Sequence, residues 1–258
     1  MTTRGDDRRY EMHQPVRLGD ATRDGRLRLD GLARYLQDVA TEDTAEVDMP
    51  RGRGWVLRKM SWDVSRLPAI YEDLVLETRC TGVGGRWAER TTTVAGVDGL
   101  NDDRSGLRHG VLITARAVWV SIELATGAPQ ALSPEFFAAY GDAIRRHKVS
   151  ARLSHPAPSA GGVRSQWPLR STDIDVFGHV NNALYWVPVE DYLAGAGHGR
   201  TIIAATIEFG SGIDPGEECD IVVDEVENEL AVWFVVGDGV RASIRAVTRS
   251  PGHDAPVA

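Results

Sequence analysis

The chain has 258 residues, 26% of them charged, and a formal net charge of −8. This length can bury a sizeable core, as one large domain or two small ones, and the acidic balance argues against a general nucleic-acid binder, because neutralising phosphates requires a basic face. Cys80 and Cys219 are the only cysteines, too few for a disulfide or zinc framework, which fits a reducing cytoplasm and predicts no metal site. The charged N-terminus argues against a signal peptide, and the lack of a long apolar run argues against a membrane span.

The first half of the sequence predicts a strand, a long helix and an antiparallel meander. Apolar residues recur at helical spacing over 30–47, and the later strand-like segments are separated by Pro68 and by the glycines of 82–85. Residues 98–109, rich in Asp, Gly and Asn, are expected to form an exposed connection. The predicted strands are 10–18, 55–67, 74–82, 86–97 and 110–123, and a short helix is predicted over 133–140.

A basic cluster followed by a Pro- and Gly-rich stretch predicts a linker over 141–162. Beyond it the same order of elements recurs, with Pro188 inside the expected helix, where it should kink the helix or mark a new start. We therefore expect a domain over 1–140, the linker, a domain over 163–250 and a flexible tail over 251–258. The second half has predicted strands at 163–169, 202–209, 220–226, 229–236 and 240–247, and its helix ends near Leu193.

The two halves carry an internal duplication. The intervals between Asp20, Gly25 and Leu27 in the first half are the same as those between Asp173, Gly178 and Val180 in the second. The stretch that begins at Trp62 likewise resembles the one that begins at Ile207, with a turn proline and acidic residues in both. A helix followed by a meander, twice over, predicts an α+β fold in which two antiparallel sheets are each wrapped around a long helix.

The densest group of reactive side chains is the run DIDVFGHVNN, residues 173–182. It lies just ahead of an apolar stretch, where a helix N-terminus is expected. Asp and Asn are also ordinary residues of turns and N-caps. The first half separates these roles, since Thr22 stands in register with Asp175 and Arg26 with His179. A turn of this kind can form without the carboxylate and the imidazole, so we interpret the run as a catalytic motif.

The motif and its surroundings resemble the acyl-acyl-carrier-protein (acyl-ACP) thioesterase family. The resemblance rests on the pattern Asp-x-Asp-x-x-Gly-His-Val-Asn-Asn-x-x-Tyr, from Asp173 to Tyr185, and on GWVLRKMSWDVSRLP and DGLARYLQDVA in the first half. It covers most of the chain and implies a tandem double hotdog fold. It further implies hydrolysis of fatty acyl-ACP to free fatty acid and holo-ACP in fatty acid biosynthesis, with acyl carrier protein as partner and no cofactor.

Two departures from the plant-type members of that family limit the mechanism. Those members carry an Asn two residues after the catalytic Asp, where this chain has Phe177, and a Glu-Cys pair where it has Gly212 and Ile213. Cys219 lies too late to replace that cysteine. What remains is the arrangement of the hydroxybenzoyl-CoA thioesterase type, in which Asp175 matches the essential carboxylate.

The expected chemistry is built around a helix start. A thioester carbonyl needs its developing oxyanion stabilised, and the backbone amides near Asn181 and Asn182 are placed to supply donors. Asp175 can activate a water as general base or attack the carbonyl itself to form an anhydride, and the sequence leaves both routes open. Gly178 is expected to adopt the positive φ of a tight turn. His179 is a candidate to orient the carboxylate or the water, or a structural residue.

The remaining candidates concern substrate contacts. Asn182 is expected to be the N-cap, and Tyr185 a pocket wall or core residue. In the first half, an apolar acyl-chain tunnel between helix and sheet is expected, lined by Trp55, Val56, Leu57 and Met60. Positive charge for docking the acidic carrier protein is expected from Arg51, Arg53, Arg58, Lys59 and the cluster 145–148.

Three alternatives stay beside this hypothesis. An acyl-CoA thioesterase would use the same groups on another carrier, and an acyl-thioester binding module would hold its ligand without cleaving it. A hotdog enoyl hydratase is disfavoured, because neither Asp173 nor Asp175 lies in that enzyme's Asp-x-Asn-Pro-x-His signature. Two hotdogs in one chain already form a pseudo-dimer, so both a monomer and a homodimer are compatible with the sequence.

Overall fold

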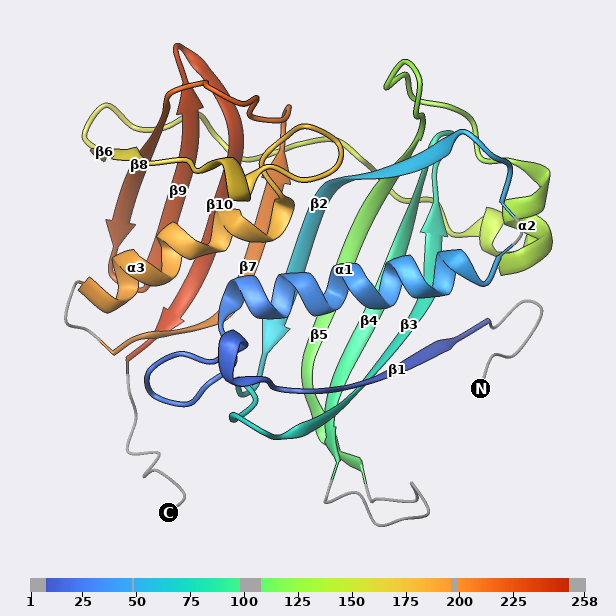
Figure 1. Ribbon diagram of the computed structural model, residues 1–258, viewed down its shortest axis with the longest axis horizontal. Coiled ribbons are helices and arrows are strands. Elements are labelled where there is room, and N and C mark those ends of the chain that lie inside the picture. The colour runs from blue at the N-terminus through green and yellow to red at the C-terminus, as the bar shows by residue number, and fades with distance from the viewer. Residues whose placement is uncertain (1–7, 48, 98–107, 196–198, 251–258) are drawn as a thin grey trace. The chain divides into compact units, whose positions relative to one another are not determined.

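The structure, a computed structural model, describes residues 8–47, 49–97, 108–195 and 199–250. The chain divides into two compact units, residues 1–152 and 153–258, coloured blue to green and yellow to red in Figure 1. The expected tail over 251–258 lies outside the described residues, as does most of the expected connection over 98–109.

Unit 1 is an antiparallel sheet that carries a long helix. Its strands are hydrogen-bonded in the order β1-β3-β4-β5-β2, and helix α1 lies across them (Figure 1). The helix-then-meander prediction is therefore confirmed for this half. The elements are β1 (Tyr10–Pro15), α1 (Leu29–Ala45), β2 (Arg53–Val64), β3 (Asp73–Val83), β4 (Trp87–Val97), β5 (Arg108–Glu123) and α2 (Pro134–Tyr140), with 3-10 turns η1 (Leu18–Asp20) and η2 (Asp142–Arg146).

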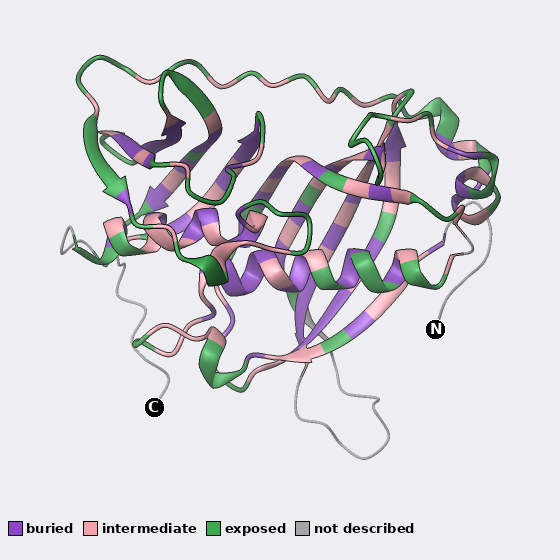
Figure 2. Cartoon of the chain, turned by 45° about the horizontal axis from the view of Figure 1, so that its top comes forward, coloured by how far each residue is buried: buried purple, intermediate pink, exposed green. Residues whose placement is uncertain are grey.

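Helix α1 forms because its apolar residues repeat at intervals of three and four. Leu29, Leu32, Leu36 and Val39 are all at most 4% exposed, and such spacing gathers them along one stripe of a helix. Figure 2 shows the buried residues of α1 as purple segments, most of them in its N-terminal half. Burying each leucine contributes about 2 kcal/mol, so packing against the sheet, rather than helix propensity, holds α1 in place.

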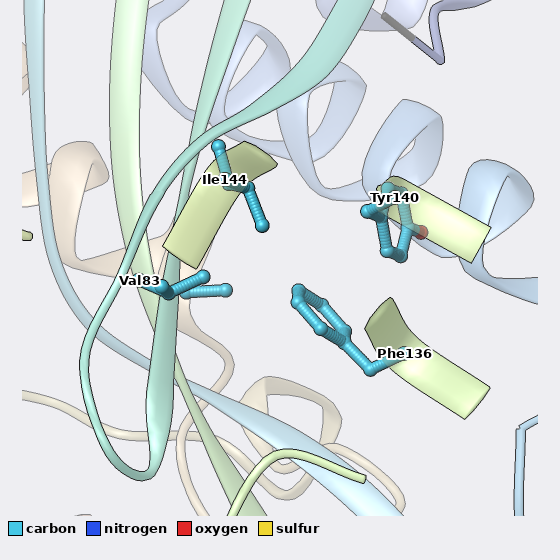
Figure 3. Close-up of a cluster of buried hydrophobic side chains, with 5 residues drawn as sticks. Val83, Phe136, Tyr140 and Ile144 are labelled. Atoms are coloured by element: carbon cyan, nitrogen blue, oxygen red, sulfur yellow. The ribbon is translucent and has the colours of Figure 1, made fainter. Parts of the chain in front are cut away.

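The short helices α2 and η2 cover one end of the sheet of unit 1. Ser133 caps α2 by accepting a hydrogen bond from the Phe136 N–H at 3.3 Å. Phe136, Tyr140 and Ile144 pack with Val83 in the buried cluster of Figure 3. These short helices therefore cover the end of the sheet at which β3 turns into β4.

Unit 2 repeats the sheet with a different helical segment. Its strands are hydrogen-bonded in the order β7-β10-β9-β8-β6, all antiparallel. The helical segment is a five-residue 3-10 turn followed by an α-helix of nine residues. The elements are β6 (Val163–Trp167), η3 (Ser171–Asp173), η4 (Asn182–Trp186), α3 (Val187–Gly195), β7 (Thr201–Phe209), β8 (Cys219–Val226), β9 (Glu229–Val236) and β10 (Gly239–Arg249).

The prediction of a long helix in each half is thus wrong for the second half. Pro188 is the second residue of α3, where a missing N–H leaves no bond unmade because the first turn of a helix has no intrahelical acceptors for its amides. The proline therefore marks a new helix rather than a kink in one long helix.

In the described ranges, no helix is both long and apolar enough to cross a membrane.

Residues 141–162, the predicted linker, are hydrogen-bonded to their own units on either side of residue 152. In unit 1, the Val83 N–H donates to the His147 carbonyl at 2.8 Å. In unit 2, the Ser154 N–H donates to the Glu208 carboxylate at 2.8 Å and the Trp233 indole N–H donates to the Pro156 carbonyl at 2.8 Å. The predicted linker is therefore hydrogen-bonded to a sheet on both sides of residue 152.

Candidate active site

The predicted catalytic motif forms a closed turn in unit 2. The Asp175 N–H donates to the His179 carbonyl at 2.9 Å, and the Gly178 N–H donates to the Asp175 carbonyl at 3.0 Å. Ile174 and Val180 pair as an antiparallel bridge across its base. Gly178 has a φ of +81°, which L side chains rarely adopt, so the predicted positive φ is confirmed.

Unit 1 contains the same turn with other side chains. The Thr22 N–H donates to the Arg26 carbonyl at 2.7 Å, the Gly25 N–H donates to the Thr22 carbonyl at 2.9 Å, and Ala21 bridges Leu27. Gly25 has a φ of +71°. The sequence alignment of the two halves is therefore confirmed at the level of individual backbone hydrogen bonds.

The carboxylate of Asp175 stabilises its own turn. One oxygen, Oδ1, accepts a hydrogen bond from the Phe177 N–H at 2.9 Å, and the other, Oδ2, accepts one from Asn181 Nδ2 at 3.4 Å. The residue is half-buried. Because each carboxylate oxygen can accept two hydrogen bonds, both retain accepting capacity for a water or for a substrate.

Asn181, not Asn182, is the N-cap of the helical segment. Its backbone is extended, and its Oδ1 accepts from the Ala183 N–H at 2.9 Å. The expectation that Asn182 is the cap is therefore wrong by one residue. The reason is the hydrogen bond from the Asn181 N–H to the Asp173 carbonyl at 2.9 Å, which fixes Asn181 at the end of the turn, so that the helical segment starts only after it.

The same contacts narrow the choice of oxyanion donor. The amides of Asn181 and Ala183 are both engaged, so the expected free donor at Asn181 is wrong. In the part of the chain that the structure describes, the Asn182 N–H has no hydrogen-bond partner. Asn182 is therefore the residue of this pair whose amide is available to a developing oxyanion.

His179 lies against the loop that follows β7. Its Nδ1 is 2.7 Å from Asp214 Oδ1, and both side chains are at least half exposed. Gly212 lies against the ring of His179. The sequence reasoning missed Asp214, because it is separated from the motif by α3 and β7. The duplication did point to this loop. Ile213, the residue before Asp214, stands in register with Pro68, the turn proline of the first half.

Tyr185 and Cys219 lie in the core of unit 2. Tyr185 is 1% exposed and packs against the rings of Trp167, Phe209 and Phe234. It is therefore a core residue, and contact with substrate stays a prediction.

Burial raises the pKa of the Cys219 thiol to about 11. A thiol that stays protonated near neutral pH is a poor nucleophile, which agrees with a mechanism that does not use this cysteine.

Trp55 and Met60 belong to strand β2 of unit 1. A bulge between Leu57 and Lys59 inserts one extra residue, which keeps Trp55, Leu57 and Met60 on the same face. Trp55 packs against Phe136 with ring centroids 5.8 Å apart, and Met60 is buried. Val56 points to the opposite face and is exposed, so its expected place in the same lining is wrong. Acyl-chain contact by Trp55 and Met60 stays a prediction.

Unit 1 also holds a buried charged cluster that the sequence did not predict. Asp43, on α1, accepts hydrogen bonds from Arg8 Nε at 2.9 Å, Arg90 Nη1 at 2.5 Å and the Tyr140 hydroxyl at 2.9 Å. Asp43 is 1% exposed, and both arginines are below 10%. Such a cluster is tolerated in a core only because each charge is paired and hydrogen-bonded.

Within the ranges that the structure describes, no three His, Cys, Asp or Glu side chains come together as ligands for a metal ion.

Three solved structures share this fold over nearly the whole chain. An oleoyl thioesterase candidate from Lactobacillus plantarum has a TM-score of 0.76 at 19% identity, covering 95% of this chain and 97% of its own. An acyl-ACP thioesterase from Bacteroides thetaiotaomicron has 0.76 at 20%, covering 93% and 98%. The 12:0-ACP thioesterase from Umbellularia californica has 0.74 at 15%, covering 94% and 98%. The fold is thus the hotdog-like fold of thioesterases.

The sequence comparisons assign the chain more narrowly. Models for the acyl-ACP thioesterase N-terminal and C-terminal domains match residues 7–140 and 158–239. The chain therefore belongs to the acyl-ACP thioesterase family. An uncharacterized protein of Mycobacterium tuberculosis is 29% identical over 218 residues, covering 84% of this chain and 83% of its own length. Family and fold together support thioester hydrolysis.

Proposed function

We propose that this protein hydrolyses fatty acyl-ACP thioesters to free fatty acid and holo-ACP. The observation that carries the proposal is the pair of matching turns. Thr22 and Arg26 in unit 1 are replaced in unit 2 by Asp175 and His179, within the same set of backbone hydrogen bonds. The reactive groups are therefore additions to a turn that forms without them.

The proposed reaction starts at Asp175. Either its carboxylate takes a proton from a water whose oxygen attacks the thioester carbonyl carbon, or it attacks that carbon itself and the resulting anhydride is cleaved by water. In both routes the Asn182 N–H donates to the oxyanion, the C–S bond breaks and the leaving sulfur gains a proton. The products are a carboxylic acid and the carrier thiol.

The carrier preference is part of the same proposal. Family membership supports acyl-ACP as substrate, and the acidic carrier needs positive charge on a chain whose net charge is −8. We assign docking to the basic cluster 145–148 at the end of η2. Its members are exposed, and Arg145 stacks 3.3 Å above the centroid of the Phe137 ring, which fixes part of the cluster on the surface of unit 1.

A non-catalytic acyl-thioester binding module is the second candidate. It is favoured by the two hydrogen bonds that Asp175 already accepts, because an Asp in that position serves as an ordinary turn residue. An acyl-CoA thioesterase is the same chemistry on another carrier, and the relative rates on acyl-ACP and acyl-CoA separate it from the acyl-ACP enzyme.

Thiol release from matched acyl-ACP and acyl-CoA thioesters tests the proposal. We expect faster release from acyl-ACP, and a fall in kcat of about 10²- to 10⁴-fold in Asp175→Asn, which keeps the shape of the carboxylate but not its basicity. Asp24→Asn, in the matching turn of unit 1, is the control and should keep full activity. Acyl ligands that bind without any thiol release would identify a binding module instead. An Asp175→Asn variant with full activity would refute the residue assignment.

A further inference from the structure

The imidazole of His179 is in close contact with the backbone of the loop after β7. A Cβ added to Gly212 would lie 2.6 Å from His179 Cγ and 2.8 Å from Nδ1, closer than real Cβ contacts. The φ of Gly212 is not in the left-handed region, so the backbone itself would accept alanine. Glycine is therefore required at this position by the approach of the ring and not by its own conformation.

Asp214 contacts the same ring through its edge. The 2.7 Å distance from Asp214 Oδ1 to His179 Nδ1 is that of a hydrogen bond in which Nδ1–H donates to the carboxylate. This bond selects one tautomer of the neutral ring and leaves Nε2 as the nitrogen with a free lone pair. An ion pair this exposed adds little to stability, so it is better explained by its effect on the histidine.

The loop that presents Asp214 is closed independently of the histidine. The Asp214 N–H donates to Glu217 Oε2 at 2.8 Å, and the Glu217 N–H donates to the Asp214 carbonyl at 3.2 Å. Arg241 Nη2 lies 2.6 Å from Glu217 Oε1 and holds Glu217 in turn. Asp214 therefore stands on a fixed backbone when it reaches His179.

Unit 1 provides the comparison within the same chain. There the Ala69 N–H donates to Glu72 Oε2 at 2.8 Å, the Glu72 N–H donates to the Ala69 carbonyl at 3.1 Å, and Arg66 pairs with Glu72 at 2.7 Å. The loop is thus the same, but the three positions that form the histidine contact in unit 2 are occupied differently. Leu67, Ala69 and Arg26 stand in register with Gly212, Asp214 and His179.

We infer that Gly212 and Asp214 are positioning residues that hold the His179 ring with its proton on Nδ1 and with Nε2 available for proton transfer. The inference rests on the proposed thioester hydrolysis. In the general-base route Asp175 passes the proton that it takes from water to Nε2, which delivers it to the departing sulfur. In the anhydride route Nε2 takes a proton from the water that cleaves the anhydride and delivers it to the thiolate that has left. In both routes the Asp214 carboxylate stabilises the ring while it is positively charged.

The test combines NMR of the imidazole with kinetics. In protein labelled with ¹⁵N at histidine, the two ring nitrogens report the tautomer, and His179→Gln identifies the signal. We expect Nδ1–H in the wild type and loss of that preference in Asp214→Ala. We also expect kcat on acyl-ACP to fall about 10- to 100-fold with KM unchanged, and Asp214→Glu to recover part of the rate.

Gly212→Ala provides a second, independent variant. Its methyl group displaces the ring, so we expect the same loss of kcat although every charged group is retained. Gly161→Ala, where an added Cβ meets nothing within 4 Å, and Asp220→Asn, which removes an exposed carboxylate paired with Arg164, are the matched controls and should keep wild-type rates.

Failure of the inference and failure of the proposed function give different results. An unchanged tautomer in Asp214→Ala, or wild-type kcat in both Asp214→Ala and Gly212→Ala, would overturn the positioning role while hydrolysis stands. A wild-type protein that cleaves no thioester would overturn the proposed function. In that case the NMR result alone decides whether Asp214 sets the tautomer of His179.

Discussion

The turn before α1 and the turn before η4 share their backbone hydrogen bonds, their left-handed glycine and their bridging pair, yet Thr22 and Arg26 of the first stand where the second has Asp175 and His179. Unit 1 has in addition a buried charge cluster, in which Arg8, Arg90 and Tyr140 shield Asp43 from water. In unit 2 the half-buried Asp175 and the exposed His179 lie on the turn itself. The same turn is therefore compatible with side chains of different chemistry.

The comparison is tested most severely by converting the unit 2 turn into the unit 1 turn. In the double variant Asp175→Thr, His179→Arg, we expect hydrolysis of acyl-ACP to fall by at least about 100-fold. The free energy of unfolding should change by less than about 1 kcal/mol. The threonine hydroxyl loses the bond from the Phe177 N–H but can accept one from the N–H of residue 179, as Thr22 accepts from the Arg26 N–H. Thiol release and urea denaturation measure the two effects. A large loss of stability would show that the reactive side chains are also required by the fold.

The buried charge of unit 1 should matter for stability. Asp43→Ala leaves Arg8 and Arg90 buried without their carboxylate, and we expect the free energy of unfolding to fall by about 3–5 kcal/mol. Asp63→Ala, which removes an exposed pair with Arg116 in the same unit, should change it by less than about 0.5 kcal/mol. Chemical denaturation of both variants gives the measurement, and equal effects would contradict a structural role for the cluster.

The buried carboxylate of unit 2 predicts a pH dependence. Burial alone would raise the pKa of Glu208, but the N–H groups of His155 and Ser154 outweigh it and lower the pKa below 4.5. A carboxyl whose folded-state pKa is depressed stabilises the protein above its unfolded pKa and loses that contribution as the pH falls through the folded value. We therefore expect the wild type to lose more stability than Glu208→Gln between about pH 6 and pH 3. His155 faces the same carboxylate, with Nδ1 4.0 Å from Glu208 Oε2. Unfolding curves of the wild type and of Glu208→Gln at several pH values give the measurement. Parallel curves would contradict the prediction.

The smallest expected effect concerns carrier docking. Arg146→Glu combined with Lys148→Glu should raise KM for acyl-ACP severalfold and leave kcat unchanged, because the reversal weakens attraction at a surface of unit 1 that carries none of the proposed reactive groups. The effect should shrink as salt is added. Hydrolysis of an acyl-CoA substrate under the same conditions is the control, and a KM that rises equally for both carriers would place docking elsewhere.

The sequence predicted the elements well because their signals are local. Helix α1 begins and ends within two residues of its prediction, and the motif glycine needed only its spacing to indicate a left-handed turn. The start of the second helical segment was missed, because the hydrogen bond from the Asn181 N–H to Asp173 decides it. The contacts of His179 with Asp214 and of Asp43 with Arg8, Arg90 and Tyr140 join residues 35 to 97 positions apart, and no local pattern encodes them.

The different lengths of the two helical segments have a consequence for local opening. Helix α1 has 17 residues and is anchored near its C-terminal end by the ion pairs of Asp43, whereas the segment over Asn182–Gly195 starts as a 3-10 turn, whose hydrogen bonds are poorer in geometry, and continues for only nine residues. Backbone amides in such a segment should exchange with solvent long before those of α1. The half of the molecule that carries the reactive turn is then also the half whose helical segment opens first.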